Sequence, residues 1–312
     1  MAKPGIMVAA QPGERRAAIE LAQQLDRQEF DHILCPYDWA VPKGDWVGAV
    51  SEVYDALSLC SAILHATNEI TVGSGISITY MRHPADLAGA ASFNHEISGG
   101  RFRLGLGTGH AAILKPFGIT WEKPLGHIRD YVQQLRAAAR GQPLPPIWIA
   151  ALRRKMTRLA GEIAEGALGA NIPLSYVAAL QQEIPEAKRA QCTFANIAPI
   201  WINEDREEGL AFVRRFLALH MPLPNYTAFF TEAGYGEEVR RAQAALAVGD
   251  HAAVEAAISE RMAEDIGIFG SRSQMRDKIE AWQAAGVTLT VSTLWASEHQ
   301  PAAVARVAAL LA

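Results

Sequence analysis

Residues 69–110 read EITVGSGISITYMRHPADLAGAASFNHEISGGRFRLGLGTGH and predict a strand, a helix and a second strand in succession. Glu69–Ile78 is rich in β-branched residues, as strands are. Pro84–Ile97 is predicted to be a helix because its proline stands in the first turn, where proline is favoured. Arg101–Leu106 is the second predicted strand. The segment therefore predicts one strand–helix–strand unit of a parallel sheet.

The same alternation continues on both sides of this unit. Helices are predicted at Glu14–Gln28, Trp46–Thr67, Pro124–Arg140, Lys155–Glu165 and Ser271–Ala285, the last closed by Gly286. The remaining strands are predicted at Gly5–Ala10, Asp31–Cys35, Pro146–Ala150, Ala167–Asn171, Cys192–Ile202 and Val287–Thr293. Strands and helices in this order predict an α/β fold of the (β/α)8 TIM-barrel type. A doubly wound sheet is the alternative, because periodicity does not separate the two.

The length of the chain fits one large domain. Its 312 residues exceed the roughly 250 that a typical barrel needs. Glu204–Asp265 is longer than one crossover requires and is helical in pattern, with breaks at Met221–Pro224 and near Gly234–Gly236. We therefore expect a single domain over residues 1–312, with residues 204–265 as a helical insertion near the C-terminal end of the barrel.

Composition excludes several classes of partner. The net charge is −4 and no basic stripe is present, which argues against binding to nucleic acid or to a membrane surface. No apolar run approaches the roughly 18 residues of a membrane span, and the N-terminus lacks a signal-peptide pattern. Cys35, Cys60 and Cys192 are far apart, without metal-ligand or redox spacing. We expect a cytoplasmic protein with reduced thiols and no metal site.

In such barrels the active site lies where the strands end and the following loops begin. One of these places carries GLGTGH, Gly105–His110, whose glycines allow a ring or phosphate to approach the main chain closely. It differs from the dinucleotide-binding fingerprint because Gly109 comes one residue too early. An ordinary glycine turn is an equally good interpretation. His110 follows directly and has the chemistry of an acid or base near neutral pH.

A second candidate place follows the strand at Pro146–Ala150. The next residues, Ala151, Leu152, Arg153, Arg154 and Lys155, begin a helix with free N–H groups and three basic side chains, which suits a phosphate. A solvated basic turn is the alternative.

Residues 69–110 closely resemble the luciferase-like monooxygenases, and more narrowly their branch that uses the deazaflavin F420. Two further stretches resemble the same group: PIWIAALRRKMTRLAGEIAEGALGAN at Pro146–Asn171 and GIFGSRSQMRDKIEAWQAAGV at Gly267–Val287. The resemblance covers nearly the whole chain. It implies a TIM-like barrel with insertions, whose mouth binds a flavin or deazaflavin ring.

The resemblance also implies which residues hold the cofactor. The ring would rest on a bulge in the third strand, where the family has a non-proline cis peptide bond; here this bond joins Gly75 and Ile76. Gly107, Thr108 and Gly109 match the family's contacts after the fourth strand. The family's phosphate loop matches Ala150, Ala151 and Leu152, and Arg153 and Arg154 follow as cations for the phosphate or for the acidic tail of F420.

The chain departs from the family pattern at three ionisable positions. Tyr37 and Asp38 stand where many members have Asp-His. His110 stands in place of the glutamate found in sugar-phosphate dehydrogenases of the F420 branch, and Gln11 in place of a second one. Oxidation of sugar phosphates is therefore not expected. His110 is the expected proton donor or acceptor, with Asp38 as its competitor.

Three functions remain open from the sequence. The first is hydride transfer between F420 and a small organic substrate. The second is monooxygenation with reduced FMN and oxygen on the same fold. The third is a barrel that binds without catalysis, against which the intact glycine loop argues. The resemblance further implies a homodimer.

Overall fold

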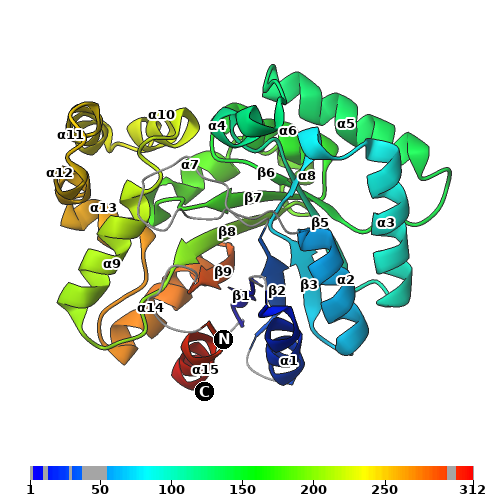
Figure 1. Ribbon diagram of the computed structural model, residues 1–312, viewed down its shortest axis with the longest axis horizontal. Helices are drawn as coiled ribbons and strands as arrows, with labels where there is room; N and C mark the ends of the chain where they lie inside the picture. The colour runs from blue at the N-terminus through cyan, green and yellow to red at the C-terminus, as the bar shows by residue number, and fades with distance from the viewer. Residues whose placement is uncertain (1–2, 10–12, 28–29, 37–54, 294–299, 312) are drawn as a thin grey trace.

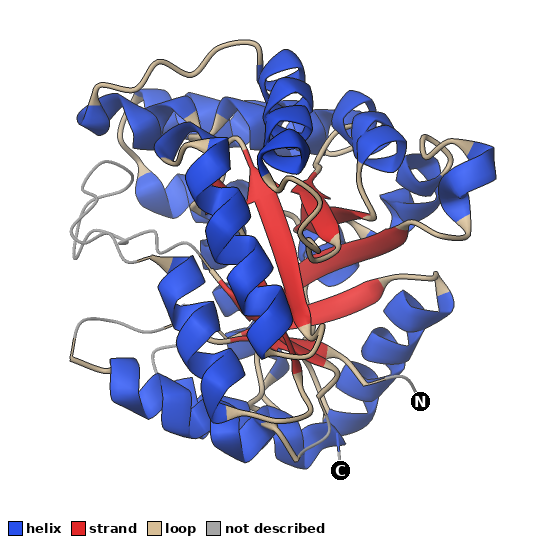
Figure 2. Cartoon of the chain, turned by 90° about the vertical axis from the view of Figure 1, so that its right-hand side faces the viewer, coloured by secondary structure: helices blue, strands red, loops and turns tan. Residues whose placement is uncertain are grey.

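The chain folds into a closed barrel of parallel strands surrounded by helices. The computed structural model describes residues 3–9, 13–27, 30–36, 55–293 and 300–311. Every strand pairing among these residues is parallel, and the order β3-β2-β1-β9-β8-β7-β6-β5-β4 is closed by a direct pairing of β3 with β5. Figure 2 shows the strands as an inner layer enclosed by helices. The predicted TIM barrel is confirmed, and the doubly wound sheet is excluded by the closure.

The strands occupy the segments that β-branched and apolar runs predicted. They are β1 (Gly5–Met7), β2 (His32–Cys35), β3 (Thr71–Ser74), β4 (Ser77–Ile78), β5 (Phe102–Gly107), β6 (Ile147–Ala150), β7 (Gly166–Ala170), β8 (Thr193–Pro199) and β9 (Thr288–Ser292). β3 and β4 are two parts of the predicted third strand, interrupted at residues 75 and 76. Both parts pair with β5 and together occupy one strand position, so the barrel is eight-stranded.

The two faces of the barrel wall carry separate cores, because successive strand residues point to opposite faces. Ile33, Leu104 and Ile149 belong to the large core between the strands and the helices. Their neighbours turn inward and form a smaller cluster: Met7, Leu34, Trp148, Leu168 and Ala195, with Ile76 and Ile197 packed against it. The barrel is therefore filled by side chains at mid-height, and ligands have access only at its ends.

The helices follow the strands and end near the predicted positions. They are α1 (Arg15–Leu25), α2 (Ala56–Ala66), α3 (Pro84–Ile97), α4 (Ala111–Leu114), α5 (Pro124–Ala138), α6 (Arg154–Ile163), α7 (Val177–Gln181), α8 (Glu186–Arg189), α9 (Arg206–Ala218), α10 (Pro224–Glu232), α11 (Gly236–Ala247), α12 (His251–Ala257), α13 (Glu260–Ile266), α14 (Arg272–Ala284) and α15 (Gln300–Leu311). α14 begins with a capping box, in which Ser271 and Gln274 bond each other's main-chain N–H groups.

One predicted helix was wrong in its starting residue, and the terminal helix was missed. The helix expected over Trp46–Thr67 begins at Ala56, because Asp55 has extended backbone angles and its side chain accepts a hydrogen bond from the N–H of Leu57 at 3.1 Å. Asp55 is therefore the N-cap. The terminal helix α15 was not predicted at all, since Gln300–Leu311 is almost uniformly apolar. It packs beside α1, next to the start of the barrel (Figure 1).

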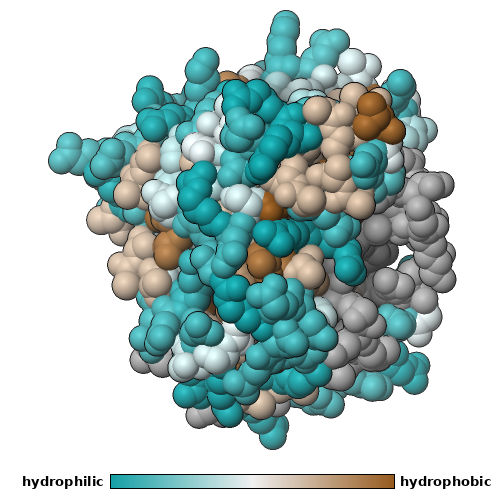
Figure 3. Space-filling model, turned by 90° about the vertical axis from the view of Figure 1, so that its left-hand side faces the viewer, coloured by the Kyte–Doolittle hydropathy of each residue, from teal (hydrophilic) through white to brown (hydrophobic). Residues whose placement is uncertain are grey.

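Five helices, α9 to α13, lie between β8 and α14 and gather on one side of the barrel, at the left of Figure 1. The breaks between α9 and α10 and between α10 and α11 fall at the predicted positions. Their outer face is largely hydrophilic, with small separate apolar areas (Figure 3). The buried rings of Phe212, Phe216, Phe229 and Phe230 belong to the main core, so these helices pack on the barrel through their aromatic side.

Candidate functional site at the barrel mouth

The C-terminal ends of the parallel strands meet at one end of the barrel, called the mouth below. At the C-terminal ends of the strands, the inward-facing residues are small or apolar. Ile76 and Ile197 pack on the interior cluster. Ala150 and Ala170 come two residues after its members Trp148 and Leu168, so they face the same side of the wall. All four are partly exposed, unlike the fully buried outward-facing residues beside them. Among the described residues, the inward-facing side chains at this end of the barrel are therefore uncharged and reach solvent.

The break in the third strand and the glycines of β5 are built against each other. The peptide bond between Gly75 and Ile76 is cis, as the resemblance implied. A Cβ added to Gly105 would lie 1.9 Å from the carbonyl oxygen of Ser74, and one added to Gly107 would lie 2.0 Å from Cδ1 of Ile76. The two strands thus approach to a distance that side chains would prevent. GLGTGH is consequently more than an ordinary turn.

A short chain of hydrogen bonds braces this contact from outside. The hydroxyl of Thr79 donates to the carbonyl oxygen of Gly107 at 3.2 Å, and Nε2 of His127 lies 2.9 Å from the same hydroxyl. Since the hydroxyl donates to Gly107, it accepts from His127, which fixes the proton on Nε2. His127 also stacks on Tyr80 with ring centroids 3.7 Å apart. The conformation of Gly107 is therefore held by two rings that sequence reasoning had not selected.

The loop after β6 has the predicted form at the mouth, but its arginines are occupied. Arg153 is the N-cap of α6, and the N–H groups of that helix's first turn lack partners within the helix. Arg153 binds the carboxylate of Glu232 on α10, and its Nε donates to Oε1 of Glu232 at 2.7 Å. Nη1 of Arg154 donates to Oε1 of Glu183 at 3.1 Å. Both arginines are exposed at the rim. Among the described residues, the main-chain amides and Lys155, rather than the two arginines, are thus the groups of this loop that can donate to an anion.

His110 follows the glycine loop and joins an aromatic cluster from distant parts of the chain. Its ring lies 5.7 Å from that of Tyr226, with the planes 21° apart. Tyr226, in the first turn of α10, also meets His220 edge to face at 4.5 Å. Asn171, directly after β7, places its amide nitrogen 3.2 Å from Nε2 of His220. Four side chains from three loops therefore meet at the mouth.

The surroundings of this cluster disfavour charge of either sign. Burial, together with the nearby His220, lowers the pKa of His110 to about 4. Burial also lowers the pKa of His220 to about 4. The pKa of the Tyr226 hydroxyl, by contrast, is raised by burial. Cation and anion are both disfavoured, so exclusion of water is the main cause.

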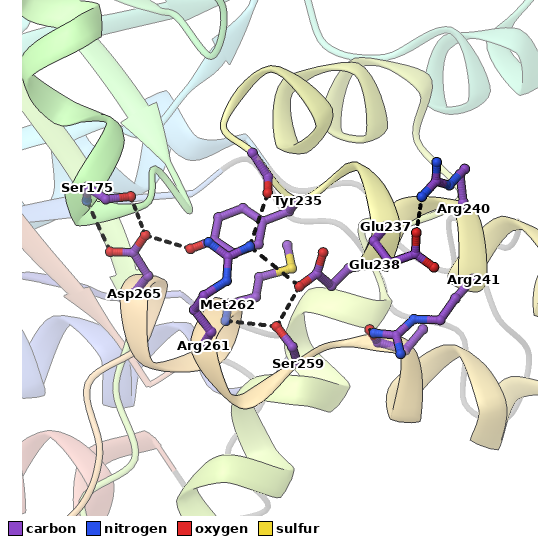
Figure 4. A network of polar contacts seen from close by, with 12 residues as sticks. Ser175, Tyr235, Glu237, Glu238, Arg240, Arg241, Ser259, Arg261, Met262 and Asp265 are labelled. Carbon is purple, nitrogen blue, oxygen red and sulfur yellow. Dashed lines mark hydrogen bonds and ion pairs between the residues drawn. The ribbon is translucent and has the colours of Figure 1, made fainter.

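A network of polar contacts between α11, α13 and the loop after β7 fixes the five helices to the barrel. The carboxylate of Asp265 on α13 accepts hydrogen bonds from the main-chain N–H of Ser175 at 3.0 Å and from the hydroxyl of Tyr235 at 2.6 Å (Figure 4). Arg261 lies over the Tyr235 ring at 4.2 Å and pairs with the buried Glu238. Since Ser175 belongs to the loop after β7, this network holds α11 and α13, and with them α10, against the mouth.

Not all predicted site residues can be placed. Asp38, Tyr37 and Gln11 lie outside the described residues. Gly75, Ile76, Gly107, Thr108, Gly109, Ala150, Ala151, Leu152, Arg153, Arg154 and His110 all lie at the mouth. Within the described ranges no group of three potential metal-ligating side chains occurs, and no helix is long and apolar enough to span a membrane. The three cysteines are buried and free.

The chain as a whole matches a known family. The family model described as "Luciferase-like monooxygenase" matches residues 1–289. The chain belongs to the luciferase-like monooxygenases. The resemblance found in the sequence is thereby confirmed.

Individual relatives of this luciferase-like chain differ in the cofactor they use. It is 26% identical over 265 residues to 5,10-methylenetetrahydromethanopterin reductase of Archaeoglobus fulgidus, covering 75% of this chain and 80% of that protein. Coenzyme F420-dependent tetrahydromethanopterin reductase of Methanopyrus kandleri has the same fold, with a TM-score of 0.75, 20% identity and coverage of 98% and 97%. So has a type II Baeyer–Villiger monooxygenase of Pseudomonas putida in complex with FMN, with a TM-score of 0.63, 15% identity and coverage of 94% and 91%.

Proposed function

We propose that this luciferase-like protein is an oxidoreductase that transfers a hydride between F420, bound at the barrel mouth, and a small organic substrate. The observation that carries the proposal is the close contact of the interrupted third strand with Gly107, beside the partly exposed Ile76 and Ala150. This surface is uncharged and built partly from main chain, which suits a flat ring system. The 26% identity to a methylenetetrahydromethanopterin reductase favours F420 over FMN.

The residues at the mouth fit such a cofactor in three places. Gly75 and Ile76 would support one face of the ring, and Gly107, Thr108 and Gly109 would border it. The N–H groups of Leu152 and Arg153, at the positive end of the α6 dipole, would hold the phosphate. When bound, the deazaflavin supplies hydride chemistry that no side chain provides. The protein contributes binding, orientation and exclusion of water.

His110 is the proposed proton acceptor for a substrate hydroxyl. With a pKa of about 4 its imidazole is neutral at neutral pH, so it can accept a hydrogen bond from the hydroxyl and take its proton as the hydride leaves the adjacent carbon. In the reverse direction the protonated imidazole of His110 returns the proton to the substrate oxygen. A base of such low pKa is weak, and Asp38 therefore remains the competing acceptor.

Two titrations and one variant test the proposal. We expect F420 to bind with a change in its absorbance spectrum and FMN to bind more weakly. His110→Gln is expected to slow turnover about 100-fold or more while leaving the Kd of F420 within a factor of a few. His65→Gln, on the exposed side of α2, is the matched control.

Three results contradict parts of the proposal. Binding of FMN alone, with oxygen consumption, indicates the monooxygenase alternative. Binding of neither cofactor indicates a non-catalytic barrel. An unchanged rate in His110→Gln removes that residue from the mechanism and leaves Asp38.

We also propose that the protein acts as a cytoplasmic homodimer. Phe93 and Ile97, one turn apart on α3, are 59% and 43% exposed, and a contact between subunits would cover such apolar side chains. Light scattering tests the assembly, and the mass of a single chain at micromolar concentration contradicts it.

A further inference from the structure

A second site at the mouth is formed by His110, Asn171, His220 and Tyr226, here called the aromatic subsite. We propose that the aromatic subsite binds the uncharged, hydrogen-bonding end of the substrate, an alcohol or carbonyl group, and rejects ionised carboxylates and phosphates. This inference rests on the proposed function, since it assigns a substrate class to the same mouth.

The position of the subsite is the first argument. His110 comes directly after the glycine loop of β5, and Asn171 directly after β7. The loops of both strands open at the mouth, so the subsite borders the proposed ring surface. His110 and His220 each keep some exposed surface although they are surrounded closely enough for burial to lower their pKa. Both rings therefore reach solvent at the mouth, while the rest of each ring is packed against protein.

The surroundings of the two histidine rings are the second argument. Tyr226 packs between the rings of His110, His220 and Phe230, and His220 also contacts Phe216 at 5.1 Å. Among the described residues, no ionised group shifts the pKa of His220 or Tyr226. A group that ionises there loses water without gaining a counter-ion. The lowered pKa of His220 indicates this for a cation, and the raised pKa of Tyr226 indicates it for an anion.

Arg153, the arginine nearest this end of the rim, is not available to neutralise a negatively charged ligand. Arg153 comes from the loop after β6, next to that of β5, but its guanidinium is paired with Glu232. Glu232 lies on the same helix as Tyr226, so α10 supplies both the aromatic wall and the carboxylate that neutralises the arginine. An anionic substrate would have to displace this carboxylate.

The hydrogen bonds of His220 give the subsite a direction. Its Nδ1 lies 2.9 Å from the carbonyl oxygen of Phe216 and therefore carries the proton, which leaves Nε2 as an acceptor. Asn171 must then present its NH2 group to Nε2, and its amide oxygen is turned the other way. That oxygen is an acceptor for a substrate hydroxyl, while His110 and Tyr226 supply groups for a carbonyl oxygen. His220 acts here as a positioning residue for Asn171.

Calorimetric titration with matched probes tests the inference. The probes are 1-phenylethanol and acetophenone as neutral ligands and benzoate as the anionic one, each titrated at pH 7.5 into the full-length protein with and without F420. We expect both neutral probes to bind at least 100-fold more tightly than benzoate. Tyr226→Leu and His220→Leu should weaken the neutral probes at least 10-fold and leave the Kd of F420 within a factor of three.

Two further variants separate a binding role from a general loss of structure. Tyr226→Phe keeps the ring and should keep most of the affinity for acetophenone. Tyr235→Phe removes a buried hydroxyl of the same five helices that makes none of the subsite's ring contacts, and it should lower the melting temperature without changing probe affinity. Benzoate binding as tightly as the alcohol overturns the inference, and so does the absence of probe binding or its insensitivity to Tyr226→Leu and His220→Leu. Failure of the proposed function shows separately, as the absence of F420 binding in a protein that still binds the neutral probes.

Discussion

Replacement of Gly107 by alanine tests the contact on which the proposed cofactor site depends. The added Cβ would lie 2.0 Å from Cδ1 of Ile76, 3.3 Å from its Cγ1 and 3.0 Å from Cβ of Ala150. The first distance is far below van der Waals contact, but it involves the end of a flexible side chain. Ile76 is therefore expected to rotate toward the mouth rather than the strands to separate.

The magnitude follows from the cost of overpacking. Adding one methyl group to a filled interior costs about 1 to 3 kcal/mol in the free energy of unfolding. The displaced Ile76 side chain would also occupy the surface proposed for the ring, so F420 affinity is expected to fall at least 10-fold. Urea denaturation measures the first effect, and a fluorescence titration with F420 measures the second.

A second substitution shows whether Ile76 is the cause. Valine lacks Cδ1, so Ile76→Val should restore most of the lost F420 affinity when combined with Gly107→Ala, and the two changes should be non-additive in stability. Gly89→Ala, where an added Cβ meets nothing within 4 Å, is the control and should stabilise α3 by about 0.5 to 1 kcal/mol. Wild-type affinity and stability in Gly107→Ala would refute the reasoning.

Two further predictions concern stability. The folded-state pKa of about 4 for His110 and His220 lies below the unfolded value of 6.5, so the unfolded state binds protons first as the pH falls. The free energy of unfolding should therefore be highest above pH 6.5 and decline down to about pH 4, by on the order of 3 kcal/mol per histidine. Urea unfolding of the wild type and of the double His→Gln variant at a series of pH values measures this. The same dependence on pH in both proteins would contradict it. Ser271→Ala should lower the free energy of unfolding by about 1 kcal/mol through loss of the capping box, whereas unchanged stability would show that Gln274 alone suffices.

Local sequence patterns were sufficient for the elements of the barrel. β-branched runs and amphipathic stretches place each strand and most helices, because side-chain direction depends only on the period of the backbone. They were insufficient at Asp55, where a capping side chain ends a continuous helical pattern, and at α15, whose nearly uniform apolar sequence carries no period. The family resemblance, not the pattern, supplied the cis bond before Ile76.

The composition of the mouth was only partly predictable. The glycine loop and His110 follow a strand end and can be selected by position alone. Tyr226 and His220 lie in the segment expected to be inserted, and neither was selected as a site residue. Asn171 was selected only by its position at the end of the sixth predicted strand, without a role. A histidine near the end of one helix and a tyrosine in the first turn of the next, across a proline-rich turn, is the signal that would have pointed to them.

What the sequence patterns determined by themselves are the strands and helices, their alternation and the glycines that allow β5 to approach the third strand, since these depend on neighbours along the chain. The tertiary structure decided the partners of the charges and rings: Arg153 with Glu232, Arg154 with Glu183, and His110 with Tyr226. These pairs are separated by 29 to 116 residues. They meet only because the closed barrel brings its loops to one end and α10 is held against them, which no local period of the sequence encodes.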